Sequence, residues 1–373
     1  MTTPLSVNHE QLSAVLHASL ARAPTNGPLV VAFSGGSDST ALLHILSLCG
    51  AARTRGLRAL HVDHRLAARS AEWTQHCVEV CAKLGVPLRV LRVNVRKSGD
   101  GLEAAARRAR YEALSGEMLP EELLLTAHHA DDQAETVLLR LLRGAGVHGA
   151  AGMREWRELA PGWLGRPWLE VPRSMIEAYV RDTAMQYITD PANADAVHDR
   201  NFLRLEVMPR LAARWPQASA TLARSAQLIG GASLALIQRN RTLLAEVRSE
   251  DDSSLDCASL RSLGAFDLEE VVRAFVADAD APSPPARVLA LLRAELLEAP
   301  ADAIPSLMWR GFALRRFRDA LYLTSPLPPV PREWSAHWDG CSSLALPAGL
   351  GVLHAEARTP LPLTVTFRRG GER

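Results

Sequence analysis

The sequence predicts an α/β fold with a mostly parallel sheet, then a mainly helical domain and the start of a small C-terminal domain. Short apolar runs alternate with amphipathic helical segments up to residue 150. Such alternation requires helical crossovers between parallel strands. Two loops rich in hydroxyl and carboxyl groups follow predicted strands, where ligands of open α/β sheets bind. The 373 residues suffice for two or three domains.

Apolar periodicity and capping residues place the elements of the α/β region. Strands are expected at 29–33, 57–64, 86–95 and 123–127, and helices at 8–22, 40–49, 70–84, 101–115 and 128–143. Beyond residue 160 the sequence predicts an extended segment at 163–169, helices at 173–185, 201–247 and within 256–297, paired strands in 303–323, and short strands in 343–353 and 361–367. Pro326–Pro331 is typical of a stiff, extended linker.

Composition is that of a soluble globular protein. The chain is 47% hydrophobic and 22% charged, with a net charge of +1, which argues weakly against a nucleic-acid partner. Its basic residues are nearly all arginines and they cluster, which fits either phosphate contact or a coding bias. The five cysteines form no CxxC pair, and no signal peptide or membrane-spanning run is apparent, so a cytoplasmic protein without membrane association is expected.

The loop Ser34-Gly-Gly-Ser-Asp-Ser39 joins the first strand to a helix. A glycine turn at a helix start gathers free amide groups and the positive end of the helix dipole, which suits an anion. Gly35 and Gly36 permit positive φ, and the serines add hydroxyl donors. The loop has no lysine, so it is not a Walker-type loop. We interpret it as a phosphate site rather than a simple capped turn.

A second polar segment, Thr126–Thr136, lies at the end of the 123–127 strand and contains His128, His129 and Asp132. By itself it fits equally well a metal site or a helix start enriched in acids that complement the dipole. Because a phosphate loop follows a neighbouring strand, a joint active site is the better interpretation. Asp132 would share Mg²⁺ with Asp38 or accept a proton.

The first loop resembles the PP-loop of ATP pyrophosphatases, which split ATP into AMP and pyrophosphate. Together with HHxxDQxET, it resembles the tRNA(Ile)-lysidine synthase family of this superfamily, as do Asp190-Pro-Ala-Asn, Arg200-Asn-Phe-Leu-Arg204 and the Gly101–Tyr111 run. Ala192 replaces the family's serine. The resemblance implies an adenine nucleotide alpha hydrolase-like, Rossmann-like domain at 1–215, a helical tRNA-binding domain at 216–325, and the start of a C-terminal tRNA-binding domain at 326–373, apparently truncated.

The family implies an ATP-dependent ligase that joins free L-lysine to C2 of the wobble cytidine of CAU-anticodon tRNA(Ile). The cytidine is first adenylated, with release of pyrophosphate; lysine then displaces AMP. The modified tRNA reads AUA instead of AUG and carries isoleucine identity instead of methionine. ATP and Mg²⁺ are required, and a homodimer is compatible with the sequence.

The resemblance also implies roles for individual residues. Asp38, Asp132 and Arg200 are the catalytic candidates, and Asp38 is the magnesium ligand. ATP is expected to contact Ser34, Gly35, Gly36, Ser37, Asp38, Ser39, His61, Val62, Asp63 and Arg110. Lysine is expected to contact Asp132, Glu135 and Asp190, and tRNA to contact Arg204, Arg315, Arg316 and Arg368.

Two alternatives stay open on the residues. A PP-loop tRNA thiolase would adenylate the same kind of base carbonyl, but no cysteine lies in the Asp132 or Asp190 segment to deliver sulfur. A non-catalytic nucleotide- or RNA-binding protein would not need the acids of both motifs. The mass change on the tRNA distinguishes a ligase from a thiolase, and absence of AMP release identifies a binder.

Overall fold

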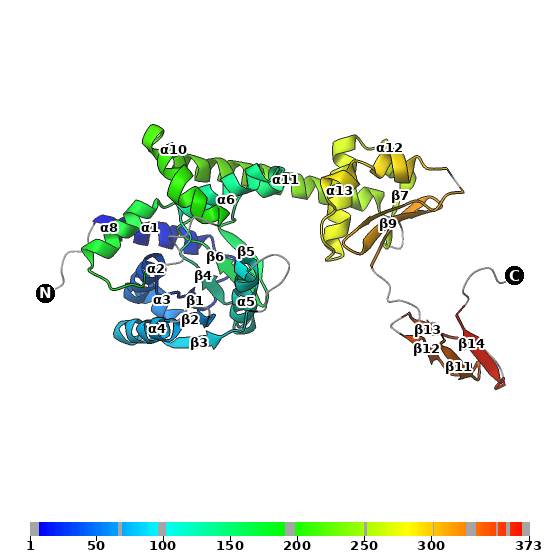
Figure 1. Cartoon of the computed structure of the whole chain (residues 1–373), viewed down its shortest axis with the longest axis horizontal. Coiled ribbons are helices and arrows are strands. Elements are labelled where there is room, and N and C mark those ends of the chain that lie inside the picture. Colours follow the sequence, from blue (N-terminus) through cyan, green and yellow to red (C-terminus); the bar gives the residue numbers. More distant parts are fainter. Residues whose placement is uncertain are drawn as a thin grey trace. The chain divides into compact units, whose positions relative to one another are not determined.

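The computed structural model describes residues 7–65, 69–95, 102–190, 198–249, 252–300, 302–325, 333–347, 350–355 and 359–367 (Figure 1). The chain forms two compact units, Met1–Ala235 and Leu236–Arg373. The sequence predicts a domain boundary at 215/216, and that boundary stays a prediction.

A six-stranded sheet forms the centre of the first unit. Its strands are β1 (Leu29–Ala32), β2 (Leu57–Asp63), β3 (Leu88–Arg92), β4 (Leu123–Leu125), β5 (Trp156–Leu159) and β6 (Gly162–Gly165). They lie in the order β3-β2-β1-β4-β6-β5, and all neighbours are parallel except β5 and β6. The predicted parallel sheet is confirmed. The antiparallel edge strand β5 was not predicted, because its four residues carry no clear alternation.

Helices lie before, between and after the strands of this unit, and those between β1 and β4 form the crossovers of the parallel sheet (Figure 1). The helices are α1 (Val7–Ala21), α2 (Ser37–Leu48), α3 (Gly50–Thr54), α4 (Ser70–Leu84), α5 (Leu102–Gly116), α6 (Ala130–Leu142), α7 (Val147–Ala150), α8 (Arg173–Asp182), α9 (Asp199–Phe202), the π-helical η2 (Leu203–Val207), α10 (Met208–Arg214) and α11 (Ala218–Val247), which continues into the second unit.

Alternate residues of β1 send their side chains into two different cores. Leu29 and Val31 join a cluster with residues of α1, α2, α4 and α8, whereas Val30 joins a cluster with Leu114 and Met118 at the end of α5. Both faces of the sheet are therefore covered, as parallel sheets require. The sheet's carboxyl edge, where the loops after β1, β2 and β4 emerge, is left for a ligand.

The predicted continuous helix at 201–247 is wrong. The chain leaves the helical conformation at Trp215 and resumes it at Ala218. Pro216 supplies the physical reason, because it has no amide hydrogen and disfavours helical geometry in the residue before it. By length and composition alone, α11 is apolar enough to cross a membrane, with 17% of its most apolar window buried.

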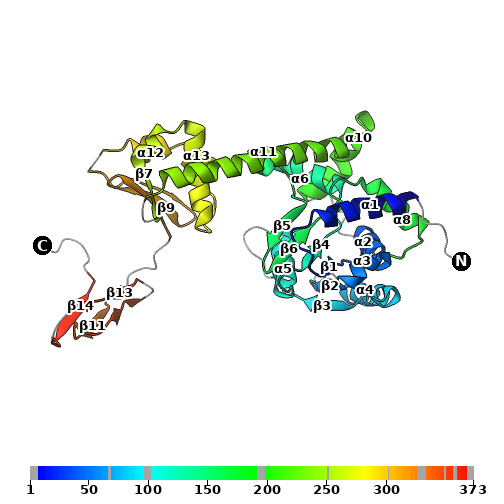
Figure 2. The same ribbon diagram turned by 180° about the vertical axis from the view of Figure 1, so that it is seen from behind.

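The second unit has a core of its own between helices and a four-stranded antiparallel sheet (Figure 2). Its elements are β7 (Ser254–Asp256), α12 (Cys257–Ser262), α13 (Ala265–Asp278), α14 (Ala286–Leu289), the π-helical η3 (Leu292–Leu297), β8 (Ser306–Trp309), β9 (Phe312–Phe317) and β10 (Ala320–Thr324). The strand pair expected around Gly311 is confirmed. The linker Pro326–Pro331 lies outside the described residues.

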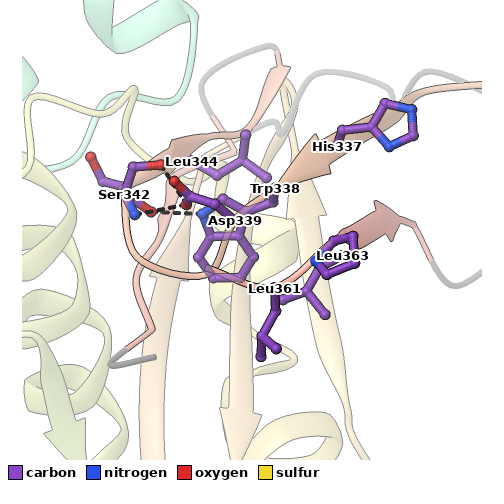
Figure 3. A pocket seen from close by; sticks show the side chains of 9 residues that line it. His337, Trp338, Asp339, Ser342, Leu344, Leu361 and Leu363 are labelled. Carbon is purple, nitrogen blue, oxygen red and sulfur yellow. Dashed lines mark hydrogen bonds between the residues drawn. The ribbon is translucent and has the colours of Figure 1, made fainter. Parts of the chain in front are cut away.

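Four short strands lie near the C-terminus. β11 (Ser335–Trp338) pairs with β14 (Leu363–Thr366), and β12 (Leu344–Ala345) pairs with β13 (Val352–Leu353). A hollow of about 490 Å³ lies beside β11, and Figure 3 shows side chains that line it. Asp339 accepts hydrogen bonds there from the amides of Cys341 and Ser342 and from the Ser342 hydroxyl, which closes a tight turn.

Candidate active site

The loop after β1 requires glycine at one position. Gly35 has φ +81°, and a Cβ there would lie 2.9 Å from both Cys77 Sγ and Ile188 Cδ1. Left-handed backbone and close packing therefore both exclude a side chain. Gly36 has φ −75°. The expectation of positive φ at both glycines is thus correct for Gly35 alone.

Gly36 is also the N-cap of α2, and no side chain caps the helix. The amides of the first turn of α2 are thereby left for a ligand, at the positive end of the dipole. The serine hydroxyls shape the loop instead. Ser39 Oγ donates to Gly36 O at 3.1 Å and lies 3.0 Å from Ser34 Oγ, which in turn accepts from the Gly36 amide. The loop suits an anion through its backbone more than through its hydroxyls.

A cleft of about 660 Å³ opens at the carboxyl ends of β1, β2 and β4, a size ordinary for small-molecule sites. Its lining includes most of the predicted ATP-binding residues: Ser34, Gly36, Asp38, Ser39, His61, Val62, Asp63 and Arg110. Gly35 and Ser37 belong to the same loop but do not line the cleft. Asp132 and Asp190, expected to contact lysine, line it as well. The structure therefore brings together residues from segments far apart in the chain.

His61 joins two strand ends beneath the cleft. Its Nδ1 lies 2.9 Å from Phe33 O and its Nε2 lies 3.3 Å from Thr74 Oγ1. Burial lowers the pKa of His61, and this effect is larger than those of the Phe33 carbonyl and Asp63, which raise the pKa. The ring is consequently neutral, with a proton on Nδ1 that it donates to Phe33. His61 holds the end of β2 against the end of β1.

His129 lies between the two acids that the sequence motifs supply. It is the N-cap of α6, where its Nδ1 accepts from the Asp132 amide at 3.4 Å and its own amide donates to Asp132 Oδ2 at 3.2 Å. Since Nδ1 is an acceptor, Nε2 carries the proton. That nitrogen lies 3.3 Å from Asp132 Oδ2 and 3.8 Å from Asp38 Oδ2. Sequence reasoning gave His129 no role of its own, although its position three residues before an acid is a capping-box signal.

Two arginines hold Asp132 and Glu135 on consecutive turns of α6. Asp132 Oδ1 accepts from Arg200 at 3.2 Å and from Arg204 at 3.0 Å. Glu135, which is 1% exposed, accepts from the Nε of Arg200 at 2.8 Å and from that of Arg204 at 2.7 Å. Asp132 and Glu135 are three residues apart on α6, which puts them on one face of that helix. Arg200 and Arg204, four residues apart across α9 and η2, likewise share a face.

This arrangement keeps Asp132 ionised. Burial by itself raises the pKa of Asp132, but neighbouring positive charges outweigh it and lower the pKa to about 2. His128 is neutral, because burial lowers its pKa to about 3. His129 lowers the pKa of Asp132 most, followed by His128, Arg200 and Arg204, and the two arginines are the neighbours with a permanent positive charge. A carboxylate with so low a pKa is a charge partner and a poor proton acceptor.

Three of the predicted site residues have their polar groups bound by other parts of the chain, and their roles stay predictions. Both carboxylate oxygens of Glu135 are occupied by arginines, so it does not stand ready to bind lysine. Arg204 is occupied by the same acids, which argues against a tRNA contact. Arg316 is 3% exposed and donates to the carbonyls of Leu297 and Pro300, so it stabilises the second unit and is not accessible to RNA.

The other tRNA candidates lie elsewhere. Arg315 is exposed on β9 and donates to Thr324 Oγ1 at 3.2 Å. Arg368 lies outside the described residues. Within the described part of the chain, three or more His, Cys, Asp or Glu side chains nowhere gather as a metal site. Mg²⁺ needs no such group when it is held by one or two carboxylates and substrate phosphates, and Asp38 and Asp132 fit that arrangement.

Comparison with known proteins agrees with this geometry. Residues 7–211 match a family described as the PP-loop domain, and residues 255–322 match the TilS substrate binding domain. A tRNA(Ile)-lysidine synthase of Xanthomonas axonopodis pv. citri is 45% identical over 93% of this chain and 80% of its own length. One from Methylococcus capsulatus is 38% identical over 92% of this chain and 81% of its own length.

Among solved structures, the U34-tRNA thiolase NcsA of Methanococcus maripaludis matches 60% of this chain and 80% of its own, with 16% identity and a TM-score of 0.49. The parallel sheet, the glycine loop after β1 and the family match define a PP-loop protein that uses ATP. More particularly, the chain belongs to the tRNA(Ile)-lysidine synthase family.

Proposed function

We propose that this chain is an ATP-dependent ligase that joins free L-lysine to C2 of the wobble cytidine of CAU-anticodon tRNA(Ile). The main support for this proposal is that one cleft is lined both by the glycine loop, which precedes a helix without a side-chain cap, and by Asp132, whose pKa is low. Such a cleft suits a polyphosphate and an ammonium group at once. The family match and the substrate-binding domain match support the tRNA substrate.

In the first half-reaction, the cytidine O2 attacks the α-phosphorus of ATP, and pyrophosphate leaves. The amides at the start of α2, which no side chain caps, and Arg110, which lines the cleft, would bind the departing phosphates. Asp38 and Asp132 would hold Mg²⁺, which supplies charge neutralisation of the phosphates when bound. Val62 and Asp63, on the cleft wall, would face the adenosine.

In the second half-reaction, the lysine ε-nitrogen attacks C2, and AMP leaves with the former O2. An ammonium ion has no lone pair, so lysine must first lose a proton. The sequence suggests Asp132 as the acceptor, but a pKa of about 2 makes it a weak base. We infer that Asp132 and Asp190 bind and orient the amine and that the proton passes to a different group.

The cysteines do not favour the thiolase alternative. Cys77, the cysteine that lies against Gly35, is fully buried, and burial raises its pKa and that of Cys81 to about 12. Such thiols are neutral and unreactive at physiological pH. A cytoplasmic location and a homodimer stay predictions.

Two measurements test the proposal. Asp38→Asn and Asp132→Asn should each weaken tRNA-dependent ATP–pyrophosphate exchange, because both carboxylates would hold Mg²⁺, and Asp132→Asn should also lose incorporation of radiolabelled lysine by roughly a hundredfold or more. Asp182→Asn, which changes an exposed carboxylate on α8, is the matched control and should retain both activities. Near-normal turnover in both cleft variants, or a tRNA mass change that corresponds to sulfur, would contradict the proposal.

A further inference from the structure

Four arginines surround one tyrosine at the margin of the cleft. The guanidinium carbons of Arg107, Arg110 and Arg157 lie 5.2, 5.4 and 5.4 Å from the centre of the Tyr111 ring. Arg166, from the end of β6, is close enough for its charge to lower the pKa of Tyr111. We call these five residues the Tyr111 arginine cluster. Arg110 and Tyr111 line the cleft, whereas the other three do not.

No carboxylate neutralises this cluster in the part of the chain that the structure describes. Arg166 and Arg157 donate to backbone carbonyls. Arg166 donates to Arg154 O at 2.7 Å, and Arg157 donates to Glu158 O. Arg166 is 4% exposed, and its Nε is buried without a hydrogen-bond partner. By contrast, Arg200 and Arg204 are each paired with two carboxylates.

The unbalanced charge is large enough to perturb the groups around it. Burial alone raises the pKa of Tyr111, yet the arginines outweigh burial and lower it. Burial, with the charges of Arg157 and Arg107, also lowers the pKa of Arg166. Guanidinium groups this close repel one another, and the π-face of one ring compensates only a part of that cost. An external anion would compensate the rest.

We propose that Arg107 and Arg157 bind phosphate groups of the RNA strand that flanks the reactive nucleotide, while the buried Arg166 contributes only its charge. This inference rests on the proposed function. Arg107 is exposed and Arg157 half-buried, so a phosphodiester reaches them from solvent. They do not line the cleft itself, where ATP is placed, whereas Arg110 does. A strand whose base enters the cleft must continue along its margin, and a basic margin beside an aromatic ring is a typical path for single-stranded RNA.

The test compares two affinities in the intact chain. Arg107→Gln with Arg157→Gln should weaken binding of a CAU anticodon stem-loop RNA about tenfold at low salt. The slope of log K against log salt should fall by about 0.7 for each lost phosphate contact. The affinity for ATP, measured by calorimetry without RNA, should not change.

Arg89→Gln is the matched control, because it removes the same charge from an arginine that pairs with Glu117. It should leave RNA affinity unchanged. If the double variant does not fold, the single variant Arg107→Gln, at an exposed position, replaces it in the RNA-binding measurement. Unchanged RNA affinity overturns the inference. A loss of ATP affinity instead of RNA affinity also overturns it, and assigns the anion to the nucleotide.

The two proposals fail separately. If the wild-type chain binds RNA through the cluster but incorporates no lysine, the proposed ligase activity is wrong and the RNA site stands. If lysine is incorporated and the variants bind RNA as well as wild type, the ligase stands and the site is wrong.

Discussion

At the scale of single residues, the acids of α6 show how neighbours decide what a side chain can do. Asp132 and Glu135 are both carboxylates one turn apart, but Glu135 is 1% exposed and spends both oxygens on arginines. Asp132 uses one oxygen for Arg200 and Arg204 and turns the other toward His129. Both oxygens of each acid therefore have partners, and Asp132 differs from Glu135 in that it lines the cleft, where a ligand reaches it.

Glu135→Gln should therefore affect both stability and catalysis. The change leaves Arg200 and Arg204 with Asp132 alone and removes a buried charge partner, so the free energy of unfolding should fall by roughly 1–3 kcal/mol. Lysine incorporation should fall while ATP binding persists. Urea unfolding and the two half-reactions are the measurements.

Glu206→Gln is the control for this effect. Glu206 pairs with Arg210 at 3.4 Å, and both side chains are exposed, so removal of its charge should cost under about 0.5 kcal/mol. Equal losses in the two variants would show that burial of the Glu135 pair contributes nothing special.

The sequence identifies the chemistry-bearing residues at this scale, because the glycine loop and the two acidic motifs depend on residue type and spacing. It does not identify their partners. Arg200 and Arg204 are 65 and 69 residues from Glu135 along the chain, and only folding brings them together. For the same reason, the buried position of Arg316 could not be seen from a run of arginines.

At the scale of elements, α1, α2 and α8 meet at a buried polar contact. Tyr179 Oη of α8 lies 2.6 Å from His44 Nδ1 of α2 and 3.4 Å from His9 Nδ1 of α1. Burial lowers the pKa of both histidines, and raises the pKa of Tyr179. The three helices thus share a contact in which burial disfavours the charged form of both rings.

The first unit should lose stability as pH falls from 7 to 5. In the unfolded chain these histidines bind protons near pH 6.5, whereas the folded chain binds them only at lower pH. Below about pH 6.5 the unfolded state therefore takes up more protons, and the free energy of unfolding decreases. His44→Gln should reduce that proton uptake by up to one, as measured from urea unfolding between pH 5 and 8.

His17→Gln changes an exposed histidine on α1 and should reproduce the wild-type pH profile. Parallel curves for wild type and His44→Gln would show that the buried contact does not link stability to pH.

Most elements of the first unit could be predicted from the hydrophobic periodicity and from the capping and turn residues that begin and end them. Ser70 begins α4 and Gly85, with φ +63°, ends it, as the sequence predicts. The missed elements are short: α3 has five residues and β5 has four. Their conformation depends on neighbouring elements more than on local preference.

At the scale of the whole molecule, the two units have separate hydrophobic cores. The first is built on both faces of the parallel sheet, and the second lies between α12–α14 and the antiparallel sheet. A chain with two cores need not unfold in one step.

Leu314→Ala should destabilise the second unit alone. Leu314 is fully buried in that core, so its truncation should cost about 2–5 kcal/mol. Saturating ATP should raise the unfolding temperature of the first unit and should not change the lowered unfolding temperature of the second unit. Calorimetry with and without ATP measures both, and a variant that also loses ATP affinity would contradict the separation.

The sequence by itself determined the α/β class, the order of the main elements, the phosphate loop and the acids that face it. These depend on hydrophobic period and on residue types at short spacing, which neighbours along the chain specify. The tertiary structure alone decided that His129 lies between Asp38 and Asp132, that two arginines occupy Glu135, and that four arginines gather around Tyr111. Those contacts join residues tens of positions apart, and their charges and distances exist only once the strands and helices have packed.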